Sequence, residues 1–348
     1  MKKVYSVLVA LMATTMSFAQ VTTIATLSHD GEVSSYYGTV ALQEAYAAAA
    51  DGDVITLSSG SFAAVDINKA LTIRGAGMQE DTVTITNPTR ILGSFSINVP
   101  TTEEHRLTLE GIYHADSITI DTLANATFVK NRLRRVTYKT AESSKMEQLV
   151  FIHCKIADFL IFPKTASASC VNCYIYGILQ VSNPTNGYEF LNCVIRQPYH
   201  DNSLGADTYI SNRIYNSTFT NCIIMYNNSS YYSLNTTNTA YYCVGIGYSS
   251  ATNMFAEMPN RTNEYTTINY SAVFKTYSGT YSDTETFELT DEAQTTYLGQ
   301  DGTQVGMYGG NLPYDPIPTN PKITKFDVAP KSTADGKLSV EIEVMAAE

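Results

Sequence analysis

The sequence predicts an all-β protein, a right-handed parallel β-helix in which each coil of the solenoid is one repeat. A short motif recurs through the middle of the chain, and the steps between its marker residues are 23, 19, 20, 29 and 21 residues. Periods near twenty with alternating apolar residues are typical of β-solenoids, and we expect roughly ten to twelve coils between residues 54 and 308. The markers are Asn131, Cys154, Cys173, Cys193, Cys222 and Cys243.

The first residues have the form of a secretory signal. Lys2 and Lys3 precede an apolar run over 4–12, and Ser17-Phe18-Ala19 provides a small-residue cleavage site. The apolar run is short for a membrane span, and no cysteine follows it that would carry a lipoprotein anchor. We therefore predict that residues 1–19 are removed and that the protein is exported, to the periplasm, the cell surface or the medium.

One helix is predicted, near 39–50, with Thr39 as its capping residue. Asp51-Gly52-Asp53 ends it, and this Asp pair is better explained as a turn than as a metal site. Because the open end of a solenoid exposes core and unpaired strand edges, we interpret this helix as an N-terminal cap. Its apolar face comprises Leu42, Ala45, Tyr46 and Ala49.

Short strands separated by turn residues follow the helix. The solenoid domain is expected over 20–310, a proline-rich linker over 311–321, and a small β element over 322–348 with strands at 322–328 and 337–345. Two strands alone are marginally stable, so this element should pack on the solenoid, a partner or another copy of the chain. The first strands of the solenoid are expected at 54–57, 62–67, 71–73, 82–86, 95–99, 107–109 and 117–120.

The recurring cysteines are predicted to form an internal ladder of reduced thiols. Successive coils lie ~4.8 Å apart, which is a poor geometry for a disulfide between stacked neighbours. Cys170 falls outside this register, and the single C-x-x-C pair does not suit zinc. The ladder members are Cys154, Cys173, Cys193, Cys222 and Cys243.

The charge balance disfavours nucleic acid and anionic membranes as partners. The chain has 22 Lys and Arg against 33 Asp and Glu, a net charge of −11, and removal of 1–19 leaves 20 − 33 = −13. Such a protein repels nucleic acid and anionic membranes. We expect no nucleic-acid partner.

Three stretches resemble the pectin-lyase-like superfamily of secreted right-handed parallel β-helices. They are the cap and first coils (42–77), the Asn-Cys-x-Ile coils, and the segment Asp301-Gly302-Thr303-Gln304-Val305-Gly306 with the residues up to 310. The resemblance covers roughly 38–310 and extends to exported bacterial members with a short C-terminal β element. It implies the fold and a link to carbohydrate, because the superfamily includes pectate lyases and polygalacturonases. A fold by itself confers no activity.

Catalysis on this fold needs clustered carboxylates, and the sequence shows no such cluster. The histidines have no evident triad partner, and no catalytic motif occurs. We therefore predict no catalytic residue, no metal and no cofactor, and we favour a protein that is not an enzyme. The acidic residues of the coils are scattered: Asp116, Asp121, Asp158, Asp201 and Asp207.

The candidate site is a basic and aromatic stripe. Residues one and three positions after the markers should point to solvent, because residues two positions after point inward. Arg guanidinium groups can bind carboxylates or sulfates with two parallel hydrogen bonds, and Tyr rings can pack against sugar rings. The alternative is an ordinary solvated strand face. The stripe comprises Arg132, Lys155 and Tyr174 at the first offset, and His114, Arg134, Tyr176 and Arg196 at the second.

Three functions remain open from the sequence. The first, which we favour, is non-catalytic glycan binding or surface display. The second is a lyase or glycoside hydrolase acting on an acidic polysaccharide, with a site in loops near 200–201 and 227–239. The third is a structural or adhesive protein that self-associates through its C-terminal strands.

Overall fold

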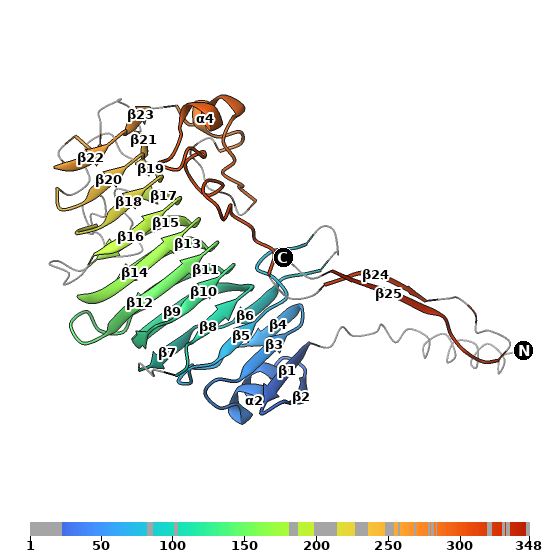
Figure 1. The fold of residues 1–348 in the computed structure, drawn as a ribbon. Helices are drawn as coiled ribbons and strands as arrows, with labels where there is room; N and C mark the ends of the chain where they lie inside the picture. The colour runs from blue at the N-terminus through green and yellow to red at the C-terminus, as the bar shows by residue number, and fades with distance from the viewer. Residues whose placement is uncertain are drawn as a thin grey trace, which may run out of the picture.

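The protein is a parallel β-helix, which confirms the predicted fold class (Figure 1). The computed structural model describes residues 23–81, 86–100, 104–180, 187–197, 214–226, 236–247, 254–318 except 257, 268, 278, 280, 281 and 283, and 322–345 except 329, 330 and 332–334. Each of the two strand columns contains ten described strands, at the lower end of the expected ten to twelve coils, and regular pairing ends at residue 267, where the following segment leaves the stack. The predicted leader, 1–19, lies outside the described residues.

Each coil contributes a strand to a first column and a strand to a second column, and within a column the strands are parallel and in register. The first column contains β3 (Val54–Leu57), β5 (Thr72–Arg74), β8 (Thr108–Glu110), β10 (Thr127–Val129), β12 (Lys145–Ile152), β14 (Thr165–Val171), β16 (Tyr188–Leu191), β18 (Thr218–Thr220), β20 (Thr239–Tyr241) and β22 (Asn260–Thr262).

The second column contains β4 (Gly60–Ala63), β6 (Thr89–Leu92), β9 (Ile112–Ala124), β11 (Arg132–Tyr138), β13 (Lys155–Phe162), β15 (Tyr174–Gln180), β17 (Val194–Gln197), β19 (Ile223–Tyr226), β21 (Val244–Ile246) and β23 (Tyr265–Thr267). The far ends of β9, β11, β13 and β15 continue onto a third face, where β7 (Phe95–Val99) also pairs. Of the expected strand at 82–86, residues 82–85 lie outside the described residues.

The N-terminal end of the stack is covered by a hairpin and a helix. Strands β1 (Ile24–His29) and β2 (Glu32–Tyr37) pair antiparallel, and β1 also pairs antiparallel with β3. The hairpin turns at Asp30-Gly31, both with positive φ, which is a strong hairpin signal that the sequence reading missed. Helix α2 (Ala41–Ala48) buries the predicted face. Its N-cap is Val40, without a side-chain hydrogen bond, so the prediction of Thr39 as the cap was wrong.

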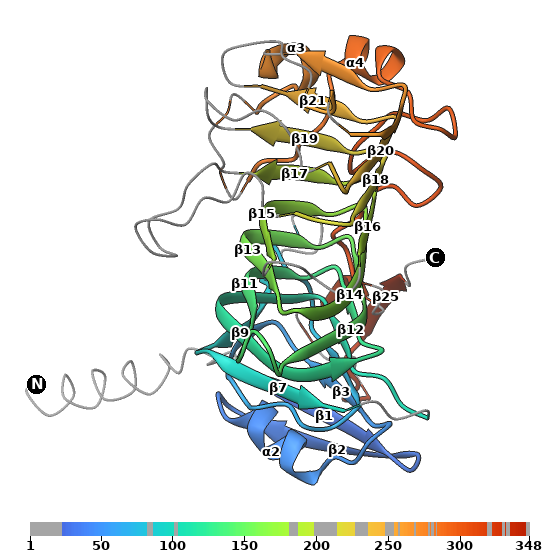
Figure 2. The same cartoon turned by 90° about the vertical axis from the view of Figure 1, so that its left-hand side faces the viewer.

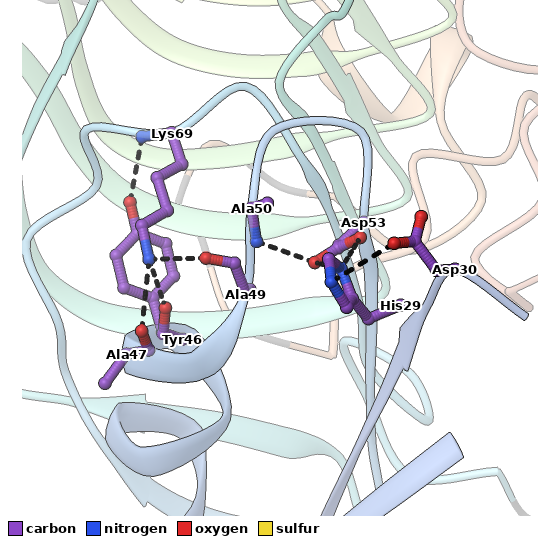
Figure 3. Close-up of polar contacts among 8 residues, drawn as sticks. All are labelled: His29, Asp30, Tyr46, Ala47, Ala49, Ala50, Asp53 and Lys69. Atoms are coloured by element: carbon purple, nitrogen blue, oxygen red, sulfur yellow. Dashed lines mark hydrogen bonds and ion pairs between the residues drawn. The ribbon is translucent and has the colours of Figure 1, made fainter. Parts of the chain in front are cut away.

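Polar side chains bind the C-terminal end of helix α2 and the turn that follows it, as Figure 3 shows. Lys69 Nζ donates to the carbonyls of Tyr46 and Ala49, both at 2.7 Å, so a cation satisfies the last turn of the helix. Asp53 accepts from the Ala50 amide at 2.6 Å and pairs with the His29 ring at 2.9 Å. These contacts give Asp53 a structural role in the turn.

The interior of the first column is a stack of aromatic rings. Phe128 and Phe151 stack at 4.7 Å between ring centroids, and Phe190 and Phe219 at 5.1 Å. Cys170 lies in register between Phe151 and Phe190, so it takes an aromatic position of this stack, outside the thiol ladder. This explains why Cys170 departs from the spacing of the other cysteines.

A sharp corner joins the first column to the second in each coil. The residue at the corner has a left-handed backbone, with φ between 50° and 54° at Lys130, His153, Asn172, Asn192 and Asn221. Asn adopts this conformation more readily than most residues, which explains the recurrent Asn before the marker cysteine.

The residue after each corner is small and buried. The five ladder thiols are free, and each donates to a carbonyl of the preceding coil, for example Cys193 Sγ to Cys170 O at 3.3 Å. Asn131 takes the ladder position in the coil before Cys154, and its side-chain amide donates to Leu109 O at 2.7 Å. Burial raises the pKa of the Cys154, Cys193 and Cys243 thiols, which keeps them protonated as donors.

After β23 the chain leaves the coils through helices α3 (Tyr270–Val273) and α4 (Asp291–Thr296). Residues 297–318, which we call the strap, then run back along the corner side of the stack (Figure 1). Beyond them β24 (Lys322–Val328) and β25 (Val340–Met345) form an antiparallel hairpin. The hairpin projects away from the coils (Figure 1), and the predicted C-terminal strand pair is thus present.

Candidate functional site

One outward-facing register position of the second column carries the charged and aromatic residues of interest. This position, which we call the outer row, is followed from coil to coil by strand pairing. Its first half is basic and aromatic, and its second half is apolar. The outer row consists of Arg90, Tyr113, Arg132, Lys155, Tyr174, Val194, Ile223, Val244 and Tyr265.

The first three residues of the outer row form a stacked array. The Arg90 and Arg132 guanidinium carbons lie 4.8 and 4.4 Å from the centre of the Tyr113 ring. The tyrosine lies between them in register, so each face of its ring meets one cation. Cation–π contact of this kind holds a guanidinium flat and orders its side chain. Arg90 is exposed, and Tyr113 and Arg132 are half-buried.

The second half of the outer row is covered by the C-terminal segment. Lys155 is 5% exposed, and Tyr174, Val194, Ile223 and Val244 are fully buried. Tyr174 stacks on Phe287 at 4.3 Å between ring centroids. A second hydrophobic cluster forms here between the outer row and the segment 273–314. Its members from that segment are Val273, Phe274, Tyr277, Phe287, Leu289, Ala293, Val305, Met307 and Tyr314.

The corner residues hold the strap in place. Asn172 Nδ2 donates to Met307 O at 2.7 Å and to Gly309 O at 2.8 Å, both buried. Asn221 Oδ1 accepts from the Gln300 amide at 2.9 Å. His153 Nε2 lies 3.1 Å from Leu312 O.

Lys130 holds the end of the strap. Its Nζ donates to Asp315 Oδ2 at 2.8 Å and to the Ile317 carbonyl. The corner residues of the coils thus also bind the strap. The strap runs antiparallel to the order of the coils, because the later corners bind its earlier residues.

A pocket of about 320 Å³ lies where the strap reaches Lys155. Lys155 Nζ donates to Glu285 O at 2.8 Å and lies 5.8 Å from the centre of the Tyr314 ring. Burial raises the pKa of Tyr308 to about 12, so its hydroxyl stays protonated and donates to Thr286 O at 3.0 Å. The pocket is lined by Gln79, Glu80, Lys155, Thr284, Thr286, Tyr308, Tyr314 and Pro316.

Three predicted stripe residues do not face solvent. His114 pairs with Leu133 and is buried, with Nδ1 3.0 Å from Ile91 O, and burial lowers its pKa. The predicted position of His114 takes Gly111 as the marker of its coil, whereas Gly111 is itself a left-handed corner and aligns with Lys130. Lys155 and Tyr174 do point away from the coil interior but are covered by the C-terminal segment, which lies more than 100 residues further along the chain.

The other stripe residues lie in three separate places. Arg134 is exposed 3.8 Å from Asp158, and the pairing register shifts at this point, which separates it from the next coil. Tyr176 and Arg196 lie together, with the guanidinium carbon 4.6 Å from the Tyr176 ring centre. Arg132 alone joins the outer-row array.

Arg90 and Tyr113 were missed by the sequence reading. Both belong to coils whose corner is formed by glycine or by an irregular loop, so no Asn-Cys motif marks them. The signal that would have found them is Gly111, since glycine is the residue best suited to a left-handed corner.

The described acidic residues of the coils are engaged in local contacts. Asp116 accepts from the Gly93 amide, Asp121 pairs with Lys139 at 3.0 Å, and Asp158 pairs with Arg135 at 2.7 Å. In the described part of the chain, no three His, Cys, Asp or Glu side chains gather where they could hold a metal ion. Asp201 and Asp207 lie outside it.

Comparison with known proteins adds no relative. No family model, no curated protein and no solved structure matches this chain significantly. Among the described helices, none combines the length and the apolar character needed to cross a bilayer.

Proposed function

We propose that this protein is an exported β-helix that binds an acidic glycan along the outer row, as a binding or surface-display protein without catalysis. The observation that carries the proposal is the Arg90–Tyr113–Arg132 array, in which one ring separates two cations on three successive coils. The array thus places two cations close together on a chain with a net charge of −11.

The geometry suits a repeating anionic chain. A guanidinium stacked on a ring keeps its N–H donors at its edge, where they can hold a carboxylate or sulfate in a bidentate manner. Because two coil steps separate the arginines, their groups repeat at about 9.6 Å along the solenoid axis. The stacking also lowers the entropy lost when a ligand binds.

The resemblance to pectin-lyase-like proteins supports a carbohydrate ligand, since members of that superfamily act on polysaccharides. The signal-like leader supports export, which would place the protein where such polymers occur. The recurrent corners and the cap are fold features and carry no information on the ligand.

The test is binding of mature protein, residues 20–348, to immobilised polygalacturonate, alginate and a neutral glucan. We expect binding to the acidic polymers that weakens with added salt, because exposed charges are screened. The variant with Arg90→Ala and Arg132→Ala should lose about ten-fold or more in affinity. Tyr113→Leu should also weaken binding although it removes no charge.

The matched control replaces one exposed and one half-buried cation elsewhere, Lys145→Ala with Lys164→Ala, as the array variant does, and should bind as the wild type does. If the control loses as much affinity as the array variant, the interaction is non-specific and the array has no special role. Release of unsaturated or reducing ends from any polymer would instead support the lyase or hydrolase alternative.

Self-association has one specific observation in its favour. Strand β25 exposes Val340, Ile342 and Val344, which are 47–60% exposed. A hairpin with such a strip is a candidate contact between copies of the chain. Sedimentation of the full chain beside a chain ending at Asn320 tests this alternative, which requires an oligomer that only the full chain forms.

A further inference from the structure

The outer row is open at one end and closed at the other. Arg90 is exposed, Tyr113 and Arg132 are half-buried, Lys155 is 5% exposed, and Tyr174 is fully buried. This gradient arises because the strap and the segment before it pack on the row from Lys155 onward. A ligand that follows the row from Arg90 therefore meets a wall at Lys155.

The pocket lies at this wall. Lys155, the next residue in register after Arg132, lines the pocket, so the pocket continues the row. Tyr314 and Pro316 of the strap line it together with Gln79 and Glu80. At about 320 Å³ it is at the small end of ligand-pocket volumes. Such a volume suits one or two sugar rings.

The lining has the chemistry of a sugar site. The Lys155 ammonium provides a positive charge, and Thr284, Thr286 and Gln79 provide hydroxyl and amide groups. Tyr308 and Tyr314 provide ring surfaces, their centroids 5.8 Å apart with the planes at 84°. Glu80 is exposed and can accept hydrogen bonds from sugar hydroxyls.

We infer that the pocket binds the terminal residue of an acidic glycan, with its carboxylate toward Lys155, so that the protein recognises chain ends. This inference rests on the proposed function, because it concerns the same row of residues. The strap acts as the stop that makes lateral binding along the middle of a polymer impossible at this position. The length of the glycan beyond the array should then contribute nothing to the number of proteins bound.

The test is the stoichiometry of binding to short and long oligogalacturonates of defined length, measured by titration calorimetry and sedimentation. End recognition predicts one protein per chain at both lengths. A number of bound proteins that rises in proportion to chain length would overturn the inference while leaving glycan binding intact. The inference would also be overturned for galacturonate ends if the protein bound neither oligomer but still bound another acidic polymer.

Variants of the residues that line the pocket provide a second test. Lys155→Met should lower affinity about ten-fold or more, because a charge-assisted hydrogen bond is lost. Lys155 also contacts the C-terminal segment, so Lys155→Met could prevent folding. The double variant Gln79→Ala with Thr284→Ala changes only exposed residues of the pocket and is the second test. It should weaken binding without changing the melting temperature. Lys145→Ala is the control. Unchanged affinity in both pocket variants, with loss in the Arg90 and Arg132 variant, would assign binding to the array and exclude the pocket.

Discussion

At the scale of single residues, position in the coil decides what a side chain does. Asn172 adopts the left-handed corner and holds two strap carbonyls, and the next residue, Cys173, is buried in the thiol ladder. Ile175, two residues after Cys173, faces inward and is buried in the core. Neighbours in sequence therefore differ completely in their contribution to stability.

Phe190 and Leu191 illustrate this difference on one strand. Phe190 is 1% exposed and stacked on Phe219, whereas Leu191 is 39% exposed. Phe190→Ala should lower the free energy of unfolding by about 3–5 kcal/mol, because it leaves a cavity in the aromatic stack. Leu191→Ala, the matched control, should change it by less than about 0.5 kcal/mol. Urea unfolding measures both, and similar losses would contradict the assigned strand orientation.

The His29–Asp53 pair should make the cap sensitive to pH. The hydrogen bond to Asp53, helped by its charge, raises the pKa of His29 above 6.5. Burial works to raise the pKa of Asp53, but hydrogen bonds from the Ala50 amide and His29 outweigh it, and the pKa falls below 3.8. The contribution of His29 to the stability of the cap is fully present below pH 6.5 and is lost as pH rises through its raised pKa. The aspartate contribution is present above 3.8 and is lost as pH falls through the lowered pKa.

Hydrogen exchange of residues 24–57 between pH 4 and pH 8 checks this expectation. Protection in the wild type should decline toward the alkaline side by more than base-catalysed exchange accounts for. In His29→Gln that extra decline should be absent, while the exposed-histidine control His105→Gln should retain it. An equal pH dependence in wild type and His29→Gln would show that the pair contributes nothing.

At the scale of elements, the strap is the feature that the repeat does not contain. Its residues do not pair as a strand of the solenoid, and side chains at the coil corners hold it. Its apolar residues Val305 and Met307 cover outer-row residues that a bare coil would expose. Gly306 fits because a side chain there would meet Ile223 at 2.9 Å.

Asn172→Gly should release the strap while keeping the corner, because glycine adopts the left-handed conformation without strain. Two buried carbonyls, of Met307 and Gly309, would lose their donor, at a cost of about 1–3 kcal/mol each. Hydrogen exchange within 300–314 should rise. The control Asn263→Gly changes an exposed corner with φ of 54° on the last coil, and it should leave that exchange unaltered. Equal effects from both variants would contradict the clamp.

At the scale of the whole molecule, the solenoid is covered differently at its end and along its side. The hairpin β1–β2 and helix α2 cover the N-terminal end, and the strap covers one side (Figure 2). The β24–β25 hairpin stands outside this arrangement and exposes its apolar residues. The strap therefore belongs to the folded unit, and the hairpin is available for contacts.

Two truncations separate these roles. A chain ending at residue 321 should melt at the temperature of the full chain, because it retains the strap. A chain ending at residue 296 uncovers Val194 and Ile223, which lie against Gly306, at a cost of up to about 1.5–3 kcal/mol for each side chain, and should melt lower and bind a hydrophobic dye. Thermal melts measure both, and equal melting of the two truncated chains would contradict the structural role of the strap.

Much of the coil architecture could be read from local pattern. The Asn-Cys spacing marks the corners at 172, 192 and 221, and alternation places Ile156, Ile175 and Ile195 in the core, as observed. The predicted helix face was also correct. The Asp30-Gly31 hairpin and the Gly111 corner carried equally local signals that were not used. The register of His114 was therefore wrong by one residue.

The sequence by itself determined the parallel coil, because each corner and each inward side chain depends on residues within one repeat. Only the tertiary structure decided which outward residues meet solvent, since the C-terminal segment that covers Lys155 and Tyr174 lies more than 100 residues further along the chain. No periodicity encodes that contact. It follows from hydrogen bonds at the corners and from apolar burial, and it confines the open part of the outer row to Arg90, Tyr113 and Arg132.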